Sequence, residues 1–236
     1  MYKIVLIACL SMFPVIGQTS AETAVVEKQA TAAPTASSLY EEMNLSGKIN
    51  SEAFEQAYNG YCSIEGRKKD ILTLIDFTKP STQERLYVFD MKKKTLLFSS
   101  VVSHGRNSGG TYATEFSNQD GSHKSSLGFY LTQNTYQGRN GYSLVLEGLE
   151  KGVNDNAKRR AIVIHGAAYA NPSVAKSGRL GRSFGCPALP QKMNKPIIDA
   201  IKNGSVLYIY AKNNQYLAKS SILKAPMKKS SLTPMG

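Results

Sequence analysis

The chain has 236 residues but no tryptophan, only three cysteines, and no long apolar run beyond its first few residues. No stretch after the N-terminus is long and apolar enough to span a bilayer. The cysteines and the three histidines show neither C-x-x-C nor H-x-x-x-H spacing, so we expect no metal and no cofactor. No zinc-finger spacing occurs, and basic residues form no stripe interleaved with aromatics, so we do not expect a nucleic-acid partner.

The residues that are present suffice for one compact domain, since 42% of them are hydrophobic. Lys and Arg outnumber Asp and Glu by 29 to 17, which gives a formal net charge of +12. This balance favours an anionic surface or substrate, although a soluble basic surface needs no partner. We expect a monomer whose partner is an anionic polymer of the cell envelope.

The first residues, MYKIVLIACLSMFPVIGQTSA, have the pattern of a secretory signal peptide. Lys3 supplies the positive start, residues 4–16 form the apolar run, and a cleavage point lies near Ala21. The sequence therefore predicts export to the periplasm or cell envelope, with residues 1–20 as the signal. A lipoprotein signal ending at Cys9 is an alternative, but it leaves a short apolar region before the cut.

Helical patterns follow a predicted linker. Residues 21–37 are rich in Ala, Thr and Ser, which is typical of a flexible connection. Over residues 38–70, Ser38 and Glu41 form a capping-box pattern, and apolar residues recur on one helix face after Asn50. We expect this segment to pack on the domain that follows it. The apolar positions are Phe54, Ala57, Tyr58 and Tyr61.

Residues 71–211 change to short runs rich in Val, Ile, Leu, Phe and Tyr, mostly separated by Gly, Asn, Asp, Ser or Lys. Seven such runs with few helices between them predict a mainly-β domain, built as a sandwich or a barrel-like pair of sheets. One helix is expected with Pro196 in its first turn and Gly204 closing it. Residues 212–236 are expected to form a basic flexible tail. The runs are ILTLIDF, RLYVFD, KTLLFSSVV, SLGFYLT, YSLVLEG, RAIVIHG and SVLYIYA.

One cysteine stands in the glycine-rich, arginine-flanked stretch GRSFGCP. Pro187 disfavours a helical conformation at Cys186, and Gly185 lets backbone N–H groups turn toward a bound carbonyl oxygen. His165 ends the strand-like run AIVIHG, where a rigidly held side chain can still reach a cleft. An imidazole that removes the thiol proton leaves a thiolate that attacks carbonyl groups. The other imidazole nitrogen needs an acceptor, which the carbonyl of Gly166 could supply.

A disulfide is the competing interpretation of this cysteine. After signal cleavage only Cys62 and Cys186 remain, and two cysteines in an oxidising compartment can pair. Such a bond would leave no nucleophile.

The pattern of His165 followed by S-x-G-C resembles the catalytic signature of YkuD-like L,D-transpeptidases. Seventeen residues (183 − 165 − 1) separate His165 from Ser183, a spacing that this family tolerates. The resemblance covers residues 71–211, which are similar to the subgroup of murein L,D-transpeptidase catalytic domain proteins. The stretches that carry it are DFTKPSTQERLYVFD, SHGRNSGG, FSNQDGSHKSSLGFY, TYQGRNGYSLVLEGLEKGVNDNAKRRAIVIHGAAY and GRLGRSFGCPALP.

This resemblance implies a β-sandwich or barrel with one or two short helices after the catalytic loop, and acyl transfer on peptidoglycan stem peptides. Cys186 would form a thioester with release of D-alanine, and an amine of a second stem would resolve it. His165 would act as base and then acid, held by the Gly166 carbonyl. Ser183 belongs to the signature, and the N–H groups of Gly185 and Cys186 would be oxyanion donors.

Two other functions stay open on the sequence. Water could replace the amine at the same thioester, which would give an L,D-carboxypeptidase or an endopeptidase. A wall-binding module without catalysis would also keep the β fold and the basic charge, but it would need no reactive thiol.

Two positions depart from the commoner pattern of the family. Phe184 stands where most members have histidine, and we treat it as a substrate contact; Pro-Ala-Leu follows Cys186 where an arginine is frequent. Arg179 and Arg182 could instead grip stem carboxylates. The alternative is that both arginines anchor the loop through hydrogen bonds to its backbone.

Three more residues are candidates for the wall of the same cleft. His104 follows a strand-like run, so it could bind stems or merely cap a strand end. Ser126 falls where relatives have a turn at the cleft rim, although it could be an ordinary strand start. Tyr130 could wall the site, but tyrosine in a β domain more often packs in the core.

Overall fold

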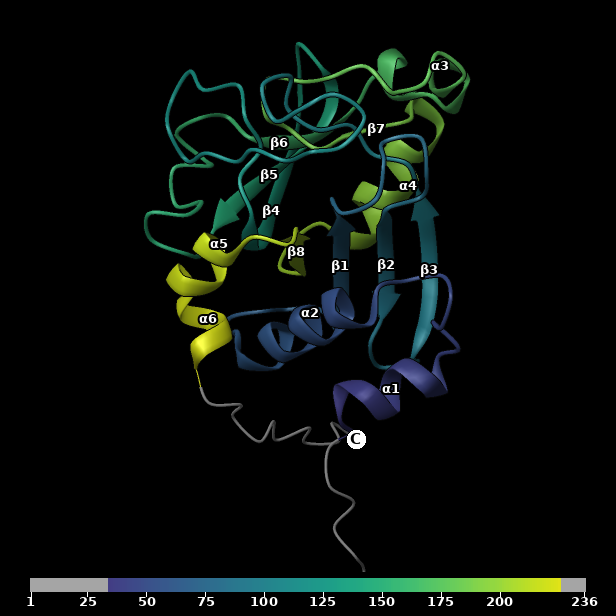
Figure 1. Ribbon diagram of the computed structural model, residues 1–236, viewed down its shortest axis with the longest axis vertical. Helices are drawn as coiled ribbons and strands as arrows, with labels where there is room; N and C mark the ends of the chain where they lie inside the picture. Colours follow the sequence, from purple (N-terminus) through teal and green to yellow (C-terminus); the bar gives the residue numbers. More distant parts are fainter. Residues whose placement is uncertain (1–33, 226–236) are drawn as a thin grey trace, which may run out of the picture. The chain divides into compact units, whose positions relative to one another are not determined.

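The computed structural model describes residues 34–225, which are built around one eight-stranded sheet (Figure 1). The strand order is β3-β2-β1-β8-β4-β5-β6-β7, and only the pairs β1–β8 and β6–β7 are parallel. The strands are β1 (Ile71–Asp76), β2 (Leu86–Asp90), β3 (Thr95–Ser100), β4 (Gly128–Gly138), β5 (Gly141–Gly148), β6 (Val163–Gly166), β7 (Ala188–Leu189) and β8 (Val206–Tyr210). The helices are α1 (Ala36–Glu42), α2 (Ser51–Ser63), the 3₁₀ turn η1 (Ala168–Ala170), α3 (Pro172–Ala175), α4 (Gln191–Ile201), α5 (Asn214–Lys219) and α6 (Ser221–Lys224).

The mainly-β prediction is confirmed, because each of the seven apolar runs contains one strand of the sheet. The central strand β8 is buried along its whole length, which explains why its sequence VLYIY does not alternate with polar residues. Helix α2 contacts β1 and β8, and α4 contacts β1, β5 and β6. The strand that the apolar pattern did not reveal is β7, which is only two residues long.

Helix α2 confirms the predicted amphipathic face. The Asn50 side chain caps it by accepting a hydrogen bond from the Ala53 N–H, and all four predicted apolar positions are buried. A side chain at Gly60 would collide with the Phe129 ring, so glycine is needed there for the helix to approach the sheet. The Phe129 ring in turn stacks on Tyr208 of β8 with 4.1 Å between the ring centroids.

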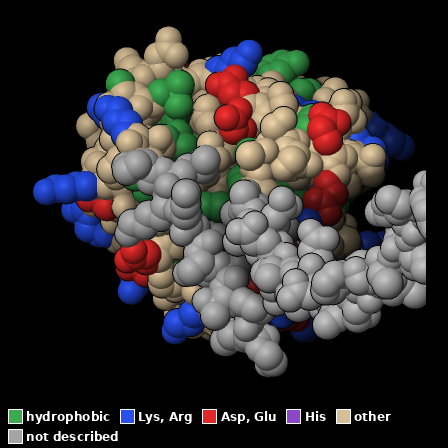
Figure 2. Space-filling model, turned by 90° about the horizontal axis from the view of Figure 1, so that it is seen from below, with side chains coloured by type: hydrophobic (Ala, Val, Ile, Leu, Met, Phe, Trp, Pro, Cys, Tyr) green, Lys and Arg blue, Asp and Glu red, His purple; other side chains and the backbone are tan. Residues whose placement is uncertain are grey.

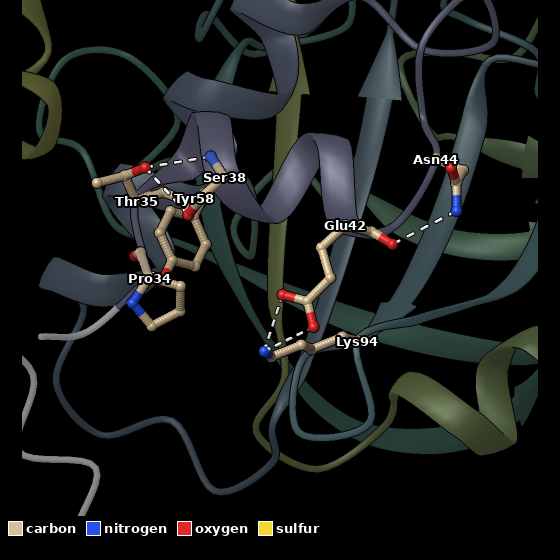
Figure 3. A network of polar contacts seen from close by, with 7 residues as sticks. All are labelled: Pro34, Thr35, Ser38, Glu42, Asn44, Tyr58 and Lys94. Atoms are coloured by element: carbon tan, nitrogen blue, oxygen red, sulfur yellow. Dashed lines mark hydrogen bonds and ion pairs between the residues drawn. The ribbon is translucent and has the colours of Figure 1, made fainter. Parts of the chain in front are cut away.

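The predicted capping box is wrong, because α1 starts earlier than expected (Figure 3). The Thr35 side chain is the N-cap and accepts from the N–H of Ser38 at 3.1 Å. Ser38 therefore lies inside the helix, and the pairing of Ser38 with Glu41 does not form the cap. Lys94 holds this helix to the turn between β2 and β3 through an ion pair of 2.8 Å with Glu42.

The start of the last predicted helix is also wrong. Helix α4 begins at Gln191, so Pro196 lies in its interior and not in its first turn. Proline there leaves the carbonyl four residues earlier without an N–H partner. The helix nevertheless forms, and its three isoleucines are fully buried against the sheet.

The C-terminal segment is more ordered than the predicted tail. Helices α5 and α6 lie within it, and α6 contacts α2 (Figure 1). The Tyr216 ring is buried, and its hydroxyl donates to the buried Glu150 carboxylate at 3.1 Å. The Ser220 hydroxyl donates to the same carboxylate. These two contacts fix the segment on the sheet.

The predicted signal peptide, residues 21–33 of the predicted linker and residues 226–236 lie outside the described part of the chain, and the last two linker residues belong to α1. No helix within residues 34–225 is both long and apolar enough to cross a bilayer. On the face shown in Figure 2, basic and acidic side chains lie interspersed.

Candidate active site

The ladder between β6 and β7 brings the candidate nucleophile and base to neighbouring segments. His165 pairs with Ala188 in this parallel ladder. Two residues before Ala188, the Cys186 Sγ accepts a hydrogen bond from the N–H of Val163, which is two residues before His165. The register of this two-residue strand therefore places the thiol beside the segment that leads into His165.

The Cys186 thiol makes two contacts with the backbone that precedes His165. Its Sγ accepts from Val163 N at 3.4 Å and donates to the Ala161 carbonyl at 3.6 Å. No hydrogen bond between residues 34–225 joins it to the His165 ring. Cys62 lies in α2, and both cysteines are free thiols.

His165 is held by the carbonyl that follows it. Its ring is 5% exposed, and Nδ1 lies 3.1 Å from the Gly166 oxygen. Because a carbonyl only accepts, Nδ1 carries the proton and Nε2 has a free lone pair. Burial lowers the pKa of His165, against the opposite effect of the Gly166 carbonyl. The imidazole is therefore neutral at pH 7.

The thiol is also protonated at rest. Burial raises the pKa of Cys186, while the Val163 N–H and the charge of Arg160 act in the opposite direction. Burial therefore favours the neutral form of both the thiol and the imidazole. A thiolate forms only when the proton moves to Nε2 or to solvent.

The loop that contains Cys186, residues 181–187, is held by a serine bridge. The Ser183 hydroxyl donates to the Cys186 carbonyl at 2.6 Å and accepts from the Gly185 N–H at 3.0 Å. Gly185 has φ +124°, a value that strongly favours glycine. Its N–H, expected as an oxyanion donor, is thus occupied within the loop. The Cys186 N–H donates to no carbonyl of the described residues.

Residues 103–106 support this loop from one side. The Ser183 N–H donates to the His104 carbonyl at 2.9 Å, and the Arg106 N–H donates to the Ser183 carbonyl at 2.8 Å. The His104 side chain points elsewhere, since it is 1% exposed and its Nδ1 lies 2.8 Å from Nη2 of Arg85. A guanidinium only donates, so Nδ1 accepts and Nε2 carries the proton. Burial, with the charge of Arg85, lowers the pKa of His104 to about 4. The His104 ring therefore presents no surface to a substrate, and its partners are the Arg85 guanidinium and the Gly109 carbonyl, which lies 3.4 Å from Nε2.

Phe184 is the one large apolar side chain of the loop that faces solvent, with 63% exposure. Its ring stacks on His123 with 4.5 Å between centroids, and the Arg106 guanidinium lies 4.7 Å from its centroid. This exposed stack stands two residues from the thiol. Phe184 therefore remains a candidate for substrate contact.

The two arginines of the loop differ. Nη1 of Arg182 donates to the carbonyls of Arg106 and Gly109, each at 2.9 Å. This is the backbone anchoring considered as the alternative. Arg179 is exposed, and its Nη1 donates only to the adjacent Leu180 carbonyl at 3.3 Å.

Ser126 and Tyr130 lie behind the site and not on its rim. Ser126 is 2% exposed and donates to the Ser117 carbonyl at 2.8 Å. Tyr130 is fully buried, and its hydroxyl donates to the Ser126 carbonyl at 3.0 Å. Both residues brace the segment 117–126, which contacts the Cys186 loop through the hydrogen bond from Ser125 Oγ to the Gly185 carbonyl.

Two residues near the thiol were not found from the sequence. The first is Arg160, whose positive charge lowers the pKa of Cys186. The second is Tyr169, whose pKa is raised to about 12, mainly by burial and also by the nearby Cys186. The sequence feature that could have indicated Arg160 is the pair of arginines directly before AIVIHG. Within residues 34–225, no group of three His, Cys, Asp or Glu side chains is arranged to hold a metal ion.

A family model described as the L,D-transpeptidase catalytic domain matches residues 45–210. No curated protein matches the sequence. An L,D-transpeptidase from Mycobacterium smegmatis has 14% identity and a TM-score of 0.38, covering 60% of this chain and 59% of that one. The helical cell shape determining protein Pgp2 from Campylobacter jejuni has 15% identity and a TM-score of 0.41, covering 67% and 57%. L,D-transpeptidase 1 from Mycobacterium tuberculosis has 13% identity and a TM-score of 0.34, covering 60% and 62%. This chain therefore spans less than two thirds of the length of each of these structures.

Proposed function

This chain belongs to the L,D-transpeptidase catalytic domain family, and from that premise we propose that it is an exported cysteine acyltransferase acting on peptidoglycan stem peptides. The family supports a function related to peptidoglycan. The acyl transfer, the export and the residue roles are our proposal.

In the proposed reaction the Cys186 thiolate attacks the carbonyl of the L-configured centre of a diamino acid in a tetrapeptide stem. The thiol proton passes to Nε2 of His165, whose Nδ1–H stays on the Gly166 carbonyl. The imidazolium then returns the proton to the departing D-alanine nitrogen, and a thioester remains. An amine of a second stem attacks the thioester, the C–S bond breaks, and the thiol is restored.

The observation that carries this proposal is the arrangement of Cys186. It is a free, partly buried thiol that follows a glycine with φ +124°, beside the strand that presents a neutral histidine with one nitrogen fixed and the other open. A wall-binding module would need none of these features. The Cys186 N–H is the available oxyanion donor, and the Gly185 N–H would join it only after leaving Ser183 Oγ.

The test is incubation of the purified chain with a disaccharide-tetrapeptide, followed by the masses of the products. A cross-linked dimer with free D-alanine is expected, and it should disappear in Cys186→Ala but persist in the matched Cys62→Ala variant. Tripeptide with free D-alanine and no dimer would instead identify a hydrolase. Intact stems together with tight binding to whole sacculi would contradict catalysis and favour the binding module.

A second experiment tests the thioester chemistry without a wall substrate. A carbapenem acylates nucleophilic thiols, so it should add one molecule covalently to Cys186. An adduct that still forms in Cys186→Ala would refute the assignment of the nucleophile.

A further inference from the structure

Arg160 is a partly buried cation whose direct partners are all neutral. Its Nη1 donates to the Ser117 carbonyl at 2.7 Å and to Ser126 Oγ at 2.6 Å. Its Nη2 donates to the Lys124 carbonyl at 2.6 Å and to Ser122 Oγ at 3.2 Å. These four bonds use every terminal N–H of the guanidinium, which is therefore a fixed charge with no free terminal donor for a substrate.

No carboxylate of the described residues forms a salt bridge with Arg160. Its neighbour Arg159 behaves differently, since it is exposed and pairs with Asp120 at 3.2 Å. Burying a cation without an anion is unfavourable, and burial accordingly lowers the pKa of Arg160. A negative charge formed nearby would offset that cost.

Tyr130, Asp120 and Cys186 are the acidic groups whose charge acts on Arg160, and Cys186 is the one that the proposed function makes the nucleophile. Nη2 lies 3.3 Å from the point where a Cβ on Gly185 would stand, directly before Cys186 in the chain. The sulfur itself contacts the Ala161 carbonyl and the Val163 N–H, which immediately follow Arg160. The thiol is thus oriented toward the segment that begins with this arginine.

We propose that Arg160 is the permanent positive charge that stabilises the Cys186 thiolate, with the Val163 N–H as its hydrogen-bond donor. Arg160 is a positioning residue in this scheme, because it neither touches the substrate nor transfers a proton. The thiol proton still leaves to His165 or to water, and the guanidinium stays charged throughout. The inference rests on the proposed function in so far as that function makes Cys186 the nucleophile.

A purely mechanical role for Arg160 predicts the opposite result. If the arginine only clamps the segment 117–126, its loss would loosen that segment and let water reach the thiol. Weaker desolvation lowers a thiol pKa, whereas removal of a nearby positive charge raises it. The sign of the change in the Cys186 pKa therefore separates the two roles.

The experiment measures the rate of Cys186 alkylation by iodoacetamide against pH, in the full chain, with and without Arg160→Gln. The modified peptide that contains Cys186 is quantified by mass spectrometry, so the other cysteines do not contribute. We expect the thiol pKa to rise by about one unit, the low end of the range for a nearby opposite charge. At pH 7 the fraction of Cys186 present as thiolate would then fall about tenfold. A thiolate of higher pKa is intrinsically about threefold more nucleophilic, so the alkylation rate should fall only about three- to fourfold.

Arg159→Gln is the matched control, because it removes the same charge one residue away and should leave the profile unchanged. An unchanged or lowered pKa in Arg160→Gln would overturn the proposal. If that variant melts below the assay temperature, Arg160→Lys keeps the charge but not the four-bond clamp. A profile close to that of the unmodified chain then supports the proposal, and a pKa raised by a full unit overturns it. Alkylation needs no stem peptide, so these results stand apart from the outcome of the transfer assay.

Discussion

Replacing Gly185 by alanine should destabilise the protein through two separable effects. The residue has φ +124°, where an L side chain is strained. The new Cβ would stand 2.9 Å from both Ile162 Cδ1 and the Lys124 carbonyl oxygen. That carbonyl cannot move freely, since Arg160 donates to it at 2.6 Å. Strain and crowding therefore act at the same position.

The magnitude follows from adding the two effects. Strain in this region of backbone space costs about 1–3 kcal/mol. Overpacking against fixed neighbours adds about 1–3 kcal/mol, so a total loss of roughly 2–6 kcal/mol is expected. Gly178 is the matched control, because its φ is +91° and a Cβ there would meet nothing within 4 Å. Gly178→Ala should show only the strain of about 1–3 kcal/mol, and the entropy that alanine removes from the unfolded chain cancels in the comparison.

Urea unfolding of both variants gives the free energies, and alkylation of Cys186 reports whether the turn still presents the thiol. We expect Gly185→Ala to be less stable than Gly178→Ala by about 1–3 kcal/mol and to react at a different rate with iodoacetamide. Equal stability of the two variants would refute the crowding argument. It would also mean that the catalytic turn can relax around a side chain.

Three further outcomes are expected. Ser183→Ala should lower kcat in the stem-peptide assay, because it removes the hydroxyl that bridges the Gly185 N–H and the Cys186 carbonyl. Ser183→Thr keeps this hydroxyl and should retain most of the rate. An equal loss of kcat in both variants would contradict this role. Between pH 6.5 and pH 4 the unfolded chain binds a proton at His104 that the folded chain does not, because the folded pKa is about 4. The free energy of unfolding should therefore decrease by up to about 3 kcal/mol as the pH is lowered from 6.5 to 4. His104→Gln should remove that part of the urea-derived pH profile, and an unchanged slope would show that His104 is not its source. Phe184→Ala should raise KM for stems with less effect on kcat and leave the urea midpoint nearly unchanged, because the ring is 63% exposed; an unchanged KM would exclude it as a substrate contact.

Much of the fold could be predicted because its strands are continuous apolar runs. A run such as VLYIY is buried on both faces, so its composition alone distinguishes it from its surroundings. The limits of helices were harder to predict, as α1 and α4 show. Thr35 and Ser38 are both good capping residues, so the local sequence alone does not choose between them, and Thr35 is the cap that forms.

The C-terminal helices illustrate a different limit. Their composition is polar and basic, which is typical of a frayed end, yet Tyr216 and Ser220 both donate to the carboxylate of Glu150. A buried carboxylate more than sixty residues earlier in the chain is not visible as a partner in a local pattern. Contacts of this range appear only once the sheet has been assembled.

At the candidate site, the sequence could nominate His165 and Cys186 but not reveal their surroundings. A motif fixes the chain order of His165 and Cys186, whereas the direction of the thiol depends on which backbone atoms lie beside it. Those atoms are the Ala161 carbonyl and the Val163 N–H, and they are set by the register of β7. A two-residue strand has too little intrinsic preference to choose that register by itself. It is held through Ser103, whose N–H donates to the Ala188 carbonyl at 2.8 Å. The buried segment 102–105 therefore helps to hold β7, and with it the position of the backbone atoms that the thiol contacts.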